Sequence, residues 1–201
     1  MKNILKHTGL LAAITIIAGL CLGLVHEITL EPIAKAKEDQ KNAAYASVFA
    51  DADDFAAVDF DQKEANKIAA KAAGKCTIDE VVEAKKGDET LGYIITVTDG
   101  EGYGGNIQFT VGVSAEGAAT GVSFLSIAES PGLGMNARDD ASFTKQYVGK
   151  PVEAFTVVKT GAAADNEIDA LSGATITSKA VTGGVNAALA YVNQVLKGGV
   201  S

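Results

Sequence analysis

The first 26 residues contain an uninterrupted apolar run. Residues 9–25 read GLLAAITIIAGLCLGLV, seventeen residues without a charge, which is at the short end of the about 17–25 residues that span hydrocarbon as a helix. Lys2 and Lys6 precede the run and Glu27 and Glu31 follow it, and this charge bias favours a cytoplasmic N-terminus. The pattern predicts a single-pass protein of the cell (inner) membrane, with the rest of the chain extracytoplasmic.

A cleaved signal peptide is the main alternative for this segment. Apolar regions of signal peptides usually hold about 7–15 residues and are soon followed by small residues. Here the nearest A-x-A-like site, residues 34–36, lies well beyond the apolar run and after Pro32. Cys21 is a weak lipoprotein site, because it follows Leu20 inside the run. We therefore expect an anchor.

The spacing of the apolar residues changes along the rest of the chain. Residues 27–60 predict a connecting arm with a short amphipathic helix, because Tyr45, Val48 and Phe49 fall on one helical stripe. Residues 61–201 predict the folded domain, and its core motifs lie within residues 90–190.

Three segments of the domain alternate apolar and polar positions as strands do: residues 93–97, 107–111 and 122–125. Turn-forming stretches, residues 100–105 and 115–117, separate them. The order predicts an antiparallel meander.

Helical patterns surround these strands. Helices are predicted over residues 61–73, 143–148 and 178–197, with a fourth strand over 155–158, while residues 78–86 are ambiguous. The last helix carries one apolar face, made of Val181, Val185, Leu189, Val192 and Leu196. The fold class is therefore α+β, an antiparallel sheet packed against helices after an N-terminal transmembrane helix.

Charge and cysteine content exclude several functions. The net charge is −8 and Arg138 is the sole arginine, which disfavours nucleic acid as a partner because phosphates need a basic face. Cys21 and Cys76 fall in lipid and in the domain respectively, so we expect no internal disulfide. With only His7 and His26 besides, we expect no metal site.

Two glycine-bearing segments are candidates for chemistry, residues 129–134 (ESPGLG) and 169–175 (DALSGAT). The second places Ser172, Thr175, Thr177 and Ser178 beside a helix start, where free N–H groups and the helix dipole favour a phosphate. Ordinary turns and a simple helix cap remain alternatives. Nucleophilic attack by these hydroxyls would need an adjacent base, and the domain has no histidine, so hydrolase chemistry is disfavoured.

These residues resemble a known family. The segment from Asp169 to Thr175 is similar to the flavinylation motif of the FMN-binding domain in membrane electron-transport complexes, and residues 102–105 (GYGG) and 129–134 resemble its two other signatures. The family more often has threonine where this chain has Ser130. The short length and near-immediate anchor resemble the G subunit of the Rnf ion-translocating complex more than the longer C subunit of the sodium-pumping NADH:quinone reductase.

The resemblance implies a covalent cofactor, FMN, joined through its phosphate to the Thr175 oxygen. A separate flavin transferase, using FAD and Mg²⁺, would make this phosphoester. It would recognise Asp169, Ser172, Gly173, Ala174 and Thr175.

The resemblance also implies further FMN contacts. Glu129 and the Leu133 loop would flank the flavin ring, although a solvent-facing Glu129 is an alternative, and Tyr103 is interpreted as a packing residue at a strand edge. The remaining expected contacts are Ser130, Gly132, Gly134, Thr177 and Ser178.

The function implied is that of an electron relay. We expect a membrane subunit of an ion-translocating ferredoxin:NAD oxidoreductase, working with other membrane and peripheral subunits and without a substrate site of its own. The alternatives are an FMN carrier like the C subunit of the quinone reductase, a membrane-anchored binding module without a flavin, and a stand-alone flavin reductase.

Overall fold

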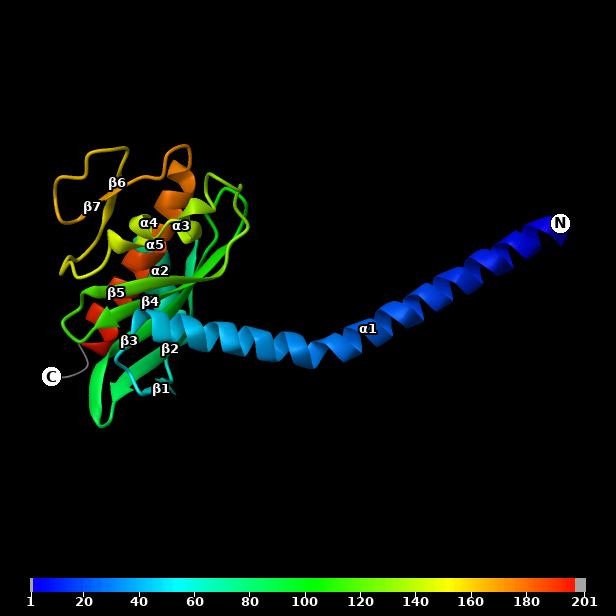
Figure 1. Ribbon diagram of the computed structural model, residues 1–201, viewed down its shortest axis with the longest axis horizontal. Helices are drawn as coiled ribbons and strands as arrows, with labels where there is room; N and C mark the ends of the chain where they lie inside the picture. The colour runs from blue at the N-terminus through cyan, green and yellow to red at the C-terminus, as the bar shows by residue number, and fades with distance from the viewer. Residues whose placement is uncertain (1, 198–201) are drawn as a thin grey trace. The chain divides into compact units, whose positions relative to one another are not determined.

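The computed structural model describes residues 2–197, and side chains from residue 6 onward. The chain divides into two compact units, Met1–Lys41 and Asn42–Ser201. The first unit consists of most of one long helix, α1 (Lys2–Val48) (Figure 1). Its side chains in the apolar stretch are exposed, and the helix is long and apolar enough to cross a membrane. The helix continues without a break past residue 26, and residues 34–47 are rich in the helix formers Ala and Lys.

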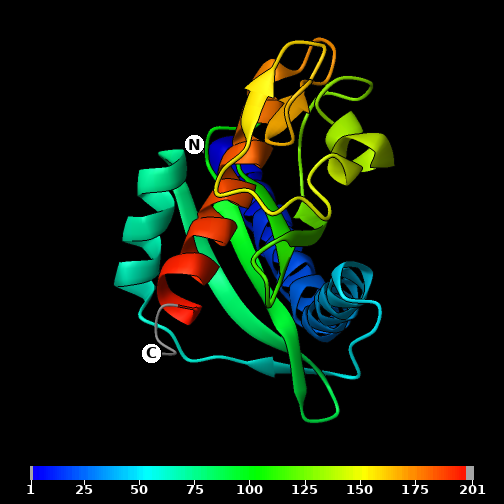
Figure 2. The ribbon, with the colours of Figure 1, turned by 90° about the vertical axis from the view of Figure 1, so that its left-hand side faces the viewer.

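The second unit is built on a five-stranded antiparallel sheet with the order β1-β2-β3-β4-β5 (Figure 2). The predicted meander is confirmed and is longer than the alternating patterns indicated. Its strands are β1 (Asp54–Ala57), β2 (Cys76–Lys86), β3 (Glu89–Asp99), β4 (Ile107–Ser114) and β5 (Ala119–Ser126). The sequence pattern of β2 was ambiguous because both of its faces are partly buried, so that neighbouring Val81 and Val82 enter different cores.

The main core lies between one face of the sheet and two helices, α2 (Gln62–Ala73) and α5 (Thr175–Tyr191). Asp61 caps α2 by accepting hydrogen bonds from two backbone N–H groups of its first turn. The apolar face of α5 meets the sheet as predicted, and Val181, Val185 and Leu189 are fully buried. A Cβ atom at Gly184 would overlap the Phe109 ring, so this glycine sets how closely α5 packs on β4.

A second, smaller core covers the other face of the sheet. It contains the predicted stripe of Tyr45, Val48 and Phe49, packed on Val82 and Ile94. Two hydrogen bonds hold this end of α1, from the Tyr45 hydroxyl to Glu80 Oε2 (2.8 Å) and from Thr120 Oγ1 to the Val48 carbonyl (2.7 Å). Residues 42–60, expected in a connecting arm, thus lie in the compact unit, and β1 extends its sheet.

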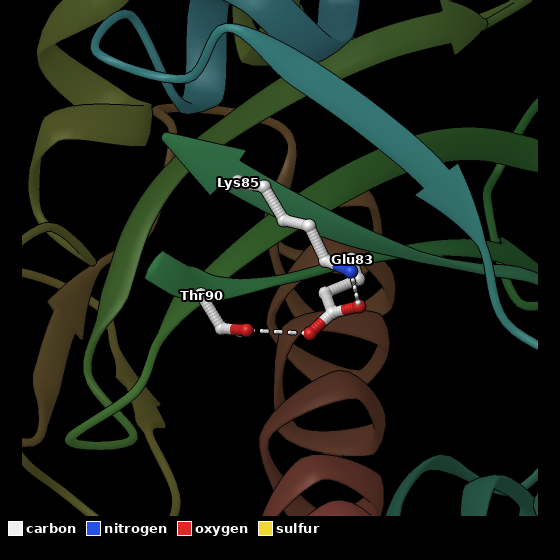
Figure 3. Close-up of polar contacts among 3 residues, drawn as sticks. All are labelled: Glu83, Lys85 and Thr90. Atoms are coloured by element: carbon white, nitrogen blue, oxygen red, sulfur yellow. Dashed lines mark hydrogen bonds and ion pairs between the residues drawn. The ribbon is translucent and has the colours of Figure 1, made fainter. Parts of the chain in front are cut away.

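The β2–β3 hairpin carries a polar cluster. The Glu83 carboxylate accepts hydrogen bonds from Thr90 Oγ1 (2.6 Å) and from Lys85 Nζ (2.9 Å) (Figure 3). These donors hold the pKa of Glu83 below its ordinary value. Glu83 and Thr90 lie on different strands, so the contact supports the register next to the irregularity between Ala84 and Lys85.

Short elements complete the unit. Helix α4 (Ala141–Lys145) overlaps the helix predicted over residues 143–148, and strand β6 (Thr156–Val158) overlaps the strand predicted over residues 155–158. Strand β6 pairs in parallel with β7 (Glu167–Asp169). A short helix, α3 (Asn136–Asp139), precedes α4, and a π-helical segment, Val192–Leu196, continues α5. Helix α5 begins three residues before the predicted start, at Thr175.

Candidate functional site

A pocket of about 500 Å³ opens where three segments meet: the β3–β4 loop, the loop after β5 and the start of α5. This volume is within the roughly 300–1,000 Å³ of small-molecule sites. The structure therefore brings together the three motifs that the sequence singled out. The lining residues are Tyr103, Glu129, Ser130, Leu133, Gly134, Gly173, Ala174, Thr175, Ile176 and Thr177.

Glu129 lies buried where the two glycine loops meet, with 7 % of its surface exposed. Its Oε1 atom accepts a hydrogen bond from the Gly104 N–H (3.2 Å). A Cβ atom at Gly134 would lie 2.7 Å from Glu129 Oε2 and 2.7 Å from Thr177 Oγ1, and one at Gly102 would lie 2.9 Å from Oε1. The Glu129 carboxylate therefore fills space that a side chain at position 102 or 134 would occupy. Because Glu129 is buried there, its side chain does not face the solvent.

The start of α5 presents donors to the pocket. Ala174 precedes the helix without a capping side chain, and Ser178 makes the first backbone bond, from its N–H to the Ala174 carbonyl (2.9 Å). The N–H groups of Thr175, Ile176 and Thr177 therefore have no partner within the helix. The Thr175 side chain, half-buried, lines the pocket beside them. This arrangement suits a phosphate group.

Ser178 does not line the pocket, and its side chain has a structural role. Its hydroxyl accepts a hydrogen bond from the Leu171 N–H (3.0 Å) and donates one to the Ala174 carbonyl (2.9 Å). It ties the loop before α5 to the first turn of the helix. Ser172, which is exposed, and Gly132, in a turn with φ of +74°, also lie outside the lining.

Asp169 lies at the end of β7 and not in the pocket lining. Its N–H donates to Gln146 Oε1 (2.7 Å), and its Oδ1 accepts from the Ala162 N–H (2.9 Å). Gly173 follows with φ of +73°, and a Cβ atom there would lie 2.9 Å from Leu133 Cδ2. The loop between β7 and α5 is thus held at both ends, and glycine is needed at its tightest point.

Two lining residues were missed as site residues, Tyr103 and Ile176. Tyr103 does not pack at a strand edge: it lies on the loop before β4 with 73 % of its surface exposed. The glycines on both sides of Tyr103 were the available signal. Ile176 is 52 % exposed, although it directly follows Thr175 in a helix that is otherwise well buried.

Comparisons with known proteins agree with this geometry. Residues 102–190 match the FMN-binding domain family. The chain is 33 % identical to the G subunit of the Na(+)-translocating ferredoxin:NAD(+) oxidoreductase complex of Acetobacterium woodii, over 98 % of this chain and 95 % of that protein. It is 37 % identical to the G subunit of the proton-translocating ferredoxin:NAD(+) oxidoreductase complex of Clostridium ljungdahlii, over 88 % and 84 %.

The chain belongs to the family of these G subunits. Its fold is also that of the C subunit of the Na(+)-translocating NADH-quinone reductase in a crystal structure from Parabacteroides distasonis, with a TM-score of 0.56 and 21 % identity, over 81 % of this chain and 95 % of that one. The family match covers all three segments that line the pocket.

FMN fits the residues of this pocket. The helix start offers N–H groups and a threonine hydroxyl to a phosphate, and Leu133 and Ile176 offer apolar surface to a ring. Glu129 is the one carboxylate in the lining. Among the described side chains no group of three or more His, Cys, Asp or Glu is placed to hold a metal ion.

Proposed function

We propose that this chain is a membrane-anchored electron-transfer subunit of an ion-translocating ferredoxin:NAD oxidoreductase of the Rnf type, carrying FMN as a phosphoester on Thr175. The observation that carries the proposal is the position of Thr175. Its side chain lines the pocket at the first position of α5, beside three N–H groups that have no partner within the helix. A phosphate on its oxygen would lie at the positive end of the helix dipole.

The residues divide the work of holding such a cofactor. The N–H groups of Ile176 and Thr177 bind the phosphate, and Glu129, bonded to Gly104, fixes the two glycine loops around the ring. The flavin supplies the electron-transfer chemistry, and the protein supplies position and environment. The covalent bond keeps the cofactor in place outside the cytoplasm, where no flavin pool would replace it.

A separate flavin transferase makes the bond, as the resemblance of residues 169–175 to the flavinylation motif implies. In that step the Thr175 hydroxyl loses its proton to the transferase and gains the FMN phosphoryl group of FAD, while AMP leaves. Asp169, Ser172, Gly173, Ala174 and Thr175 form the segment that the transferase recognises. Exposed Ser172 and Gly173 lie on the surface that it would approach.

The proposed topology follows from the charges around α1. Lys2 and Lys6 hold the N-terminus in the cytoplasm of a single-pass cell (inner) membrane protein, so the flavin domain is extracytoplasmic. Its partners are the other membrane and peripheral subunits of the complex. The chain has no substrate site of its own and relays electrons between them.

Co-expression of the full chain with a flavin transferase tests the proposal. We expect a fluorescent band on a denaturing gel and an FMN adduct on the peptide that contains Thr175. Thr175→Val removes the adduct, whereas Thr177→Val, which deletes a hydroxyl of the same pocket, keeps it. No adduct on the wild-type chain, with a transferase proven active on another acceptor, would overturn the proposal and favour a binding module without a flavin.

A further inference from the structure

Gln146 holds the start of the segment that leads to Thr175. It follows α4, and its half-buried side-chain amide contacts the backbone of Asp169, 23 residues later in the sequence. Gln146 Oε1 accepts a hydrogen bond from the Asp169 N–H (2.7 Å), and Gln146 Nε2 donates one to the Asp169 carbonyl (3.3 Å). An amide side chain offers both an acceptor and donors, so Gln146 pairs with this residue much as a neighbouring strand would.

These two bonds lie on the edge of β7 that no strand covers. The sheet here has two strands, β6 and β7. On the side that faces β6, the Ala170 N–H donates to the Val158 carbonyl (2.8 Å). The N–H and carbonyl of Asp169 bond to Gln146 on the other side. Backbone polar groups need such partners, so the Gln146 amide stabilises the end of β7 in this position.

The neighbours of Gln146 fix its own place. The next residue, Tyr147, is fully buried, and its ring meets the Phe143 ring edge-on with 5.7 Å between the ring centres. The Tyr147 hydroxyl forms a hydrogen bond with Thr182 Oγ1 of α5 (2.7 Å). Because α5 begins at Thr175, this contact connects the position of Gln146 to the helix that carries the proposed acceptor hydroxyl.

We propose that Gln146 is a positioning residue for the attachment of FMN to Thr175, because it holds residues 169–175 in the conformation that a flavin transferase accepts. The inference rests on the proposed function and adds to it a residue outside the pocket lining and outside the recognised segment. In the transfer, the bond from Thr175 Oγ1 to phosphorus forms, the pyrophosphate bond of FAD breaks, AMP leaves and the hydroxyl proton goes to the transferase. Gln146 takes no part in these bonds and acts through the backbone of Asp169.

The segment between Asp169 and α5 is open only in its middle. The Leu171 N–H donates to the Ser178 hydroxyl (3.0 Å), so the chain is tied on both sides of exposed Ser172 and Gly173. A segment that is ordered before binding loses less entropy when an enzyme binds it. Without the Gln146 bonds a share of the molecules has a released segment. The apparent affinity of the transferase then falls with the held fraction, while the rate at saturation stays the same.

The first test measures initial rates of FMN attachment at varied concentrations of the full chain in detergent, with a flavin transferase, FAD and Mg²⁺. Gln146→Met keeps the length of the side chain and removes both hydrogen bonds. The KM for the chain should rise about two- to tenfold, the range that corresponds to one hydrogen bond, with kcat unchanged. Thr120→Val removes a bond of 2.7 Å in the second core, and both constants should match the wild type.

The second test follows amide hydrogen exchange of the unmodified chain. In the wild type the Asp169 N–H should exchange more slowly than the N–H of exposed Ser172. In Gln146→Met the exchange at Asp169 should accelerate by a similar factor of about two to ten. A melting curve of each variant confirms that the fold is intact, and the comparison within the wild type needs no variant.

The outcomes separate the two proposals. Absence of the adduct on the wild-type chain overturns the proposed function. With a wild-type adduct present, an unchanged KM in Gln146→Met, or an equal rise of KM in Thr120→Val, overturns the positioning role and leaves the attachment standing. A wild-type Asp169 N–H that exchanges as fast as that of Ser172 overturns the positioning role as well.

Discussion

Asp99 is a buried carboxyl group whose ionisation should weaken the domain. It ends β3 with 1 % of its surface exposed. Its Oδ1 accepts a hydrogen bond from the Glu101 N–H (2.8 Å), whereas Oδ2 has no hydrogen-bond partner among the described residues. Burial, with a smaller contribution from the nearby charge of Glu101, raises the pKa of Asp99 to about 6 from an ordinary value of 3.8.

The direction of the effect follows from this pKa. Below about pH 4 the carboxyl group is protonated in the folded and the unfolded chain, so it costs no stability. Between about pH 4 and pH 6 the unfolded chain loses the proton first, and the free energy of unfolding falls. Above pH 6 the loss is complete, and a difference of about 2 pKa units corresponds to about 3 kcal/mol.

The variant Asp99→Asn isolates this contribution. Asparagine can still accept the Glu101 N–H bond and carries no charge, so the free energy of unfolding of the variant relative to the wild type should increase by about 3 kcal/mol from pH 4 to pH 7. Urea unfolding of the full chain in detergent, followed by circular dichroism at pH 4, 5, 6 and 7, measures it. A difference between the two proteins that stays constant across this range would refute the reasoning.

Three further predictions concern packing and reactivity. Gly134→Ala places a methyl group 2.7 Å from Glu129 Oε2 and should lower the free energy of unfolding, measured with urea, by about 1–3 kcal/mol. An unchanged urea midpoint would contradict the idea that Gly134 leaves the space for the Glu129 carboxylate. Burial raises the pKa of the Cys76 thiol to about 12, so at pH 8 only about one part in 10⁴ is thiolate. After treatment of the folded chain with an alkylating reagent, the peptide mass should show Cys76 unmodified, and modification should appear when urea is added. Thr120→Val removes the hydrogen bond to the Val48 carbonyl and should lower the free energy of unfolding by about 1 kcal/mol, whereas Thr144→Val, with an exposed hydroxyl, should change it less.

Local patterns in the sequence were sufficient for much of the fold. The apolar run at residues 9–25 needs no tertiary contact to be recognised, because a membrane span depends on length and hydropathy alone. The alternation at residues 93–97, 107–111 and 122–125 predicted β3, β4 and β5 and their antiparallel order, since short turns connect them. The apolar face of α5 was likewise visible as a helical period.

Other elements depend on contacts that no local pattern shows. Strand β1 has four residues without alternation and exists because it pairs with β2. The two faces of β2 enter two cores, so its apolar positions do not alternate. The end of α1 packs on the sheet because Gly112 and Gly121 leave room for Val48. These glycines lie 64 and 73 positions after Val48 in the sequence.

The candidate site shows the same division. The sequence by itself determined the chemistry: the hydroxyls from Ser172 to Ser178, a glycine-rich loop before β4, and Glu129 in a loop of its own. Only the tertiary structure decided that Thr175 lines the pocket while the Ser178 hydroxyl braces the helix start, and that Tyr103 is exposed at the rim. The reason is physical: residue type sets what a side chain can bond, whereas burial and close approach depend on segments that the chain brings together only when it folds.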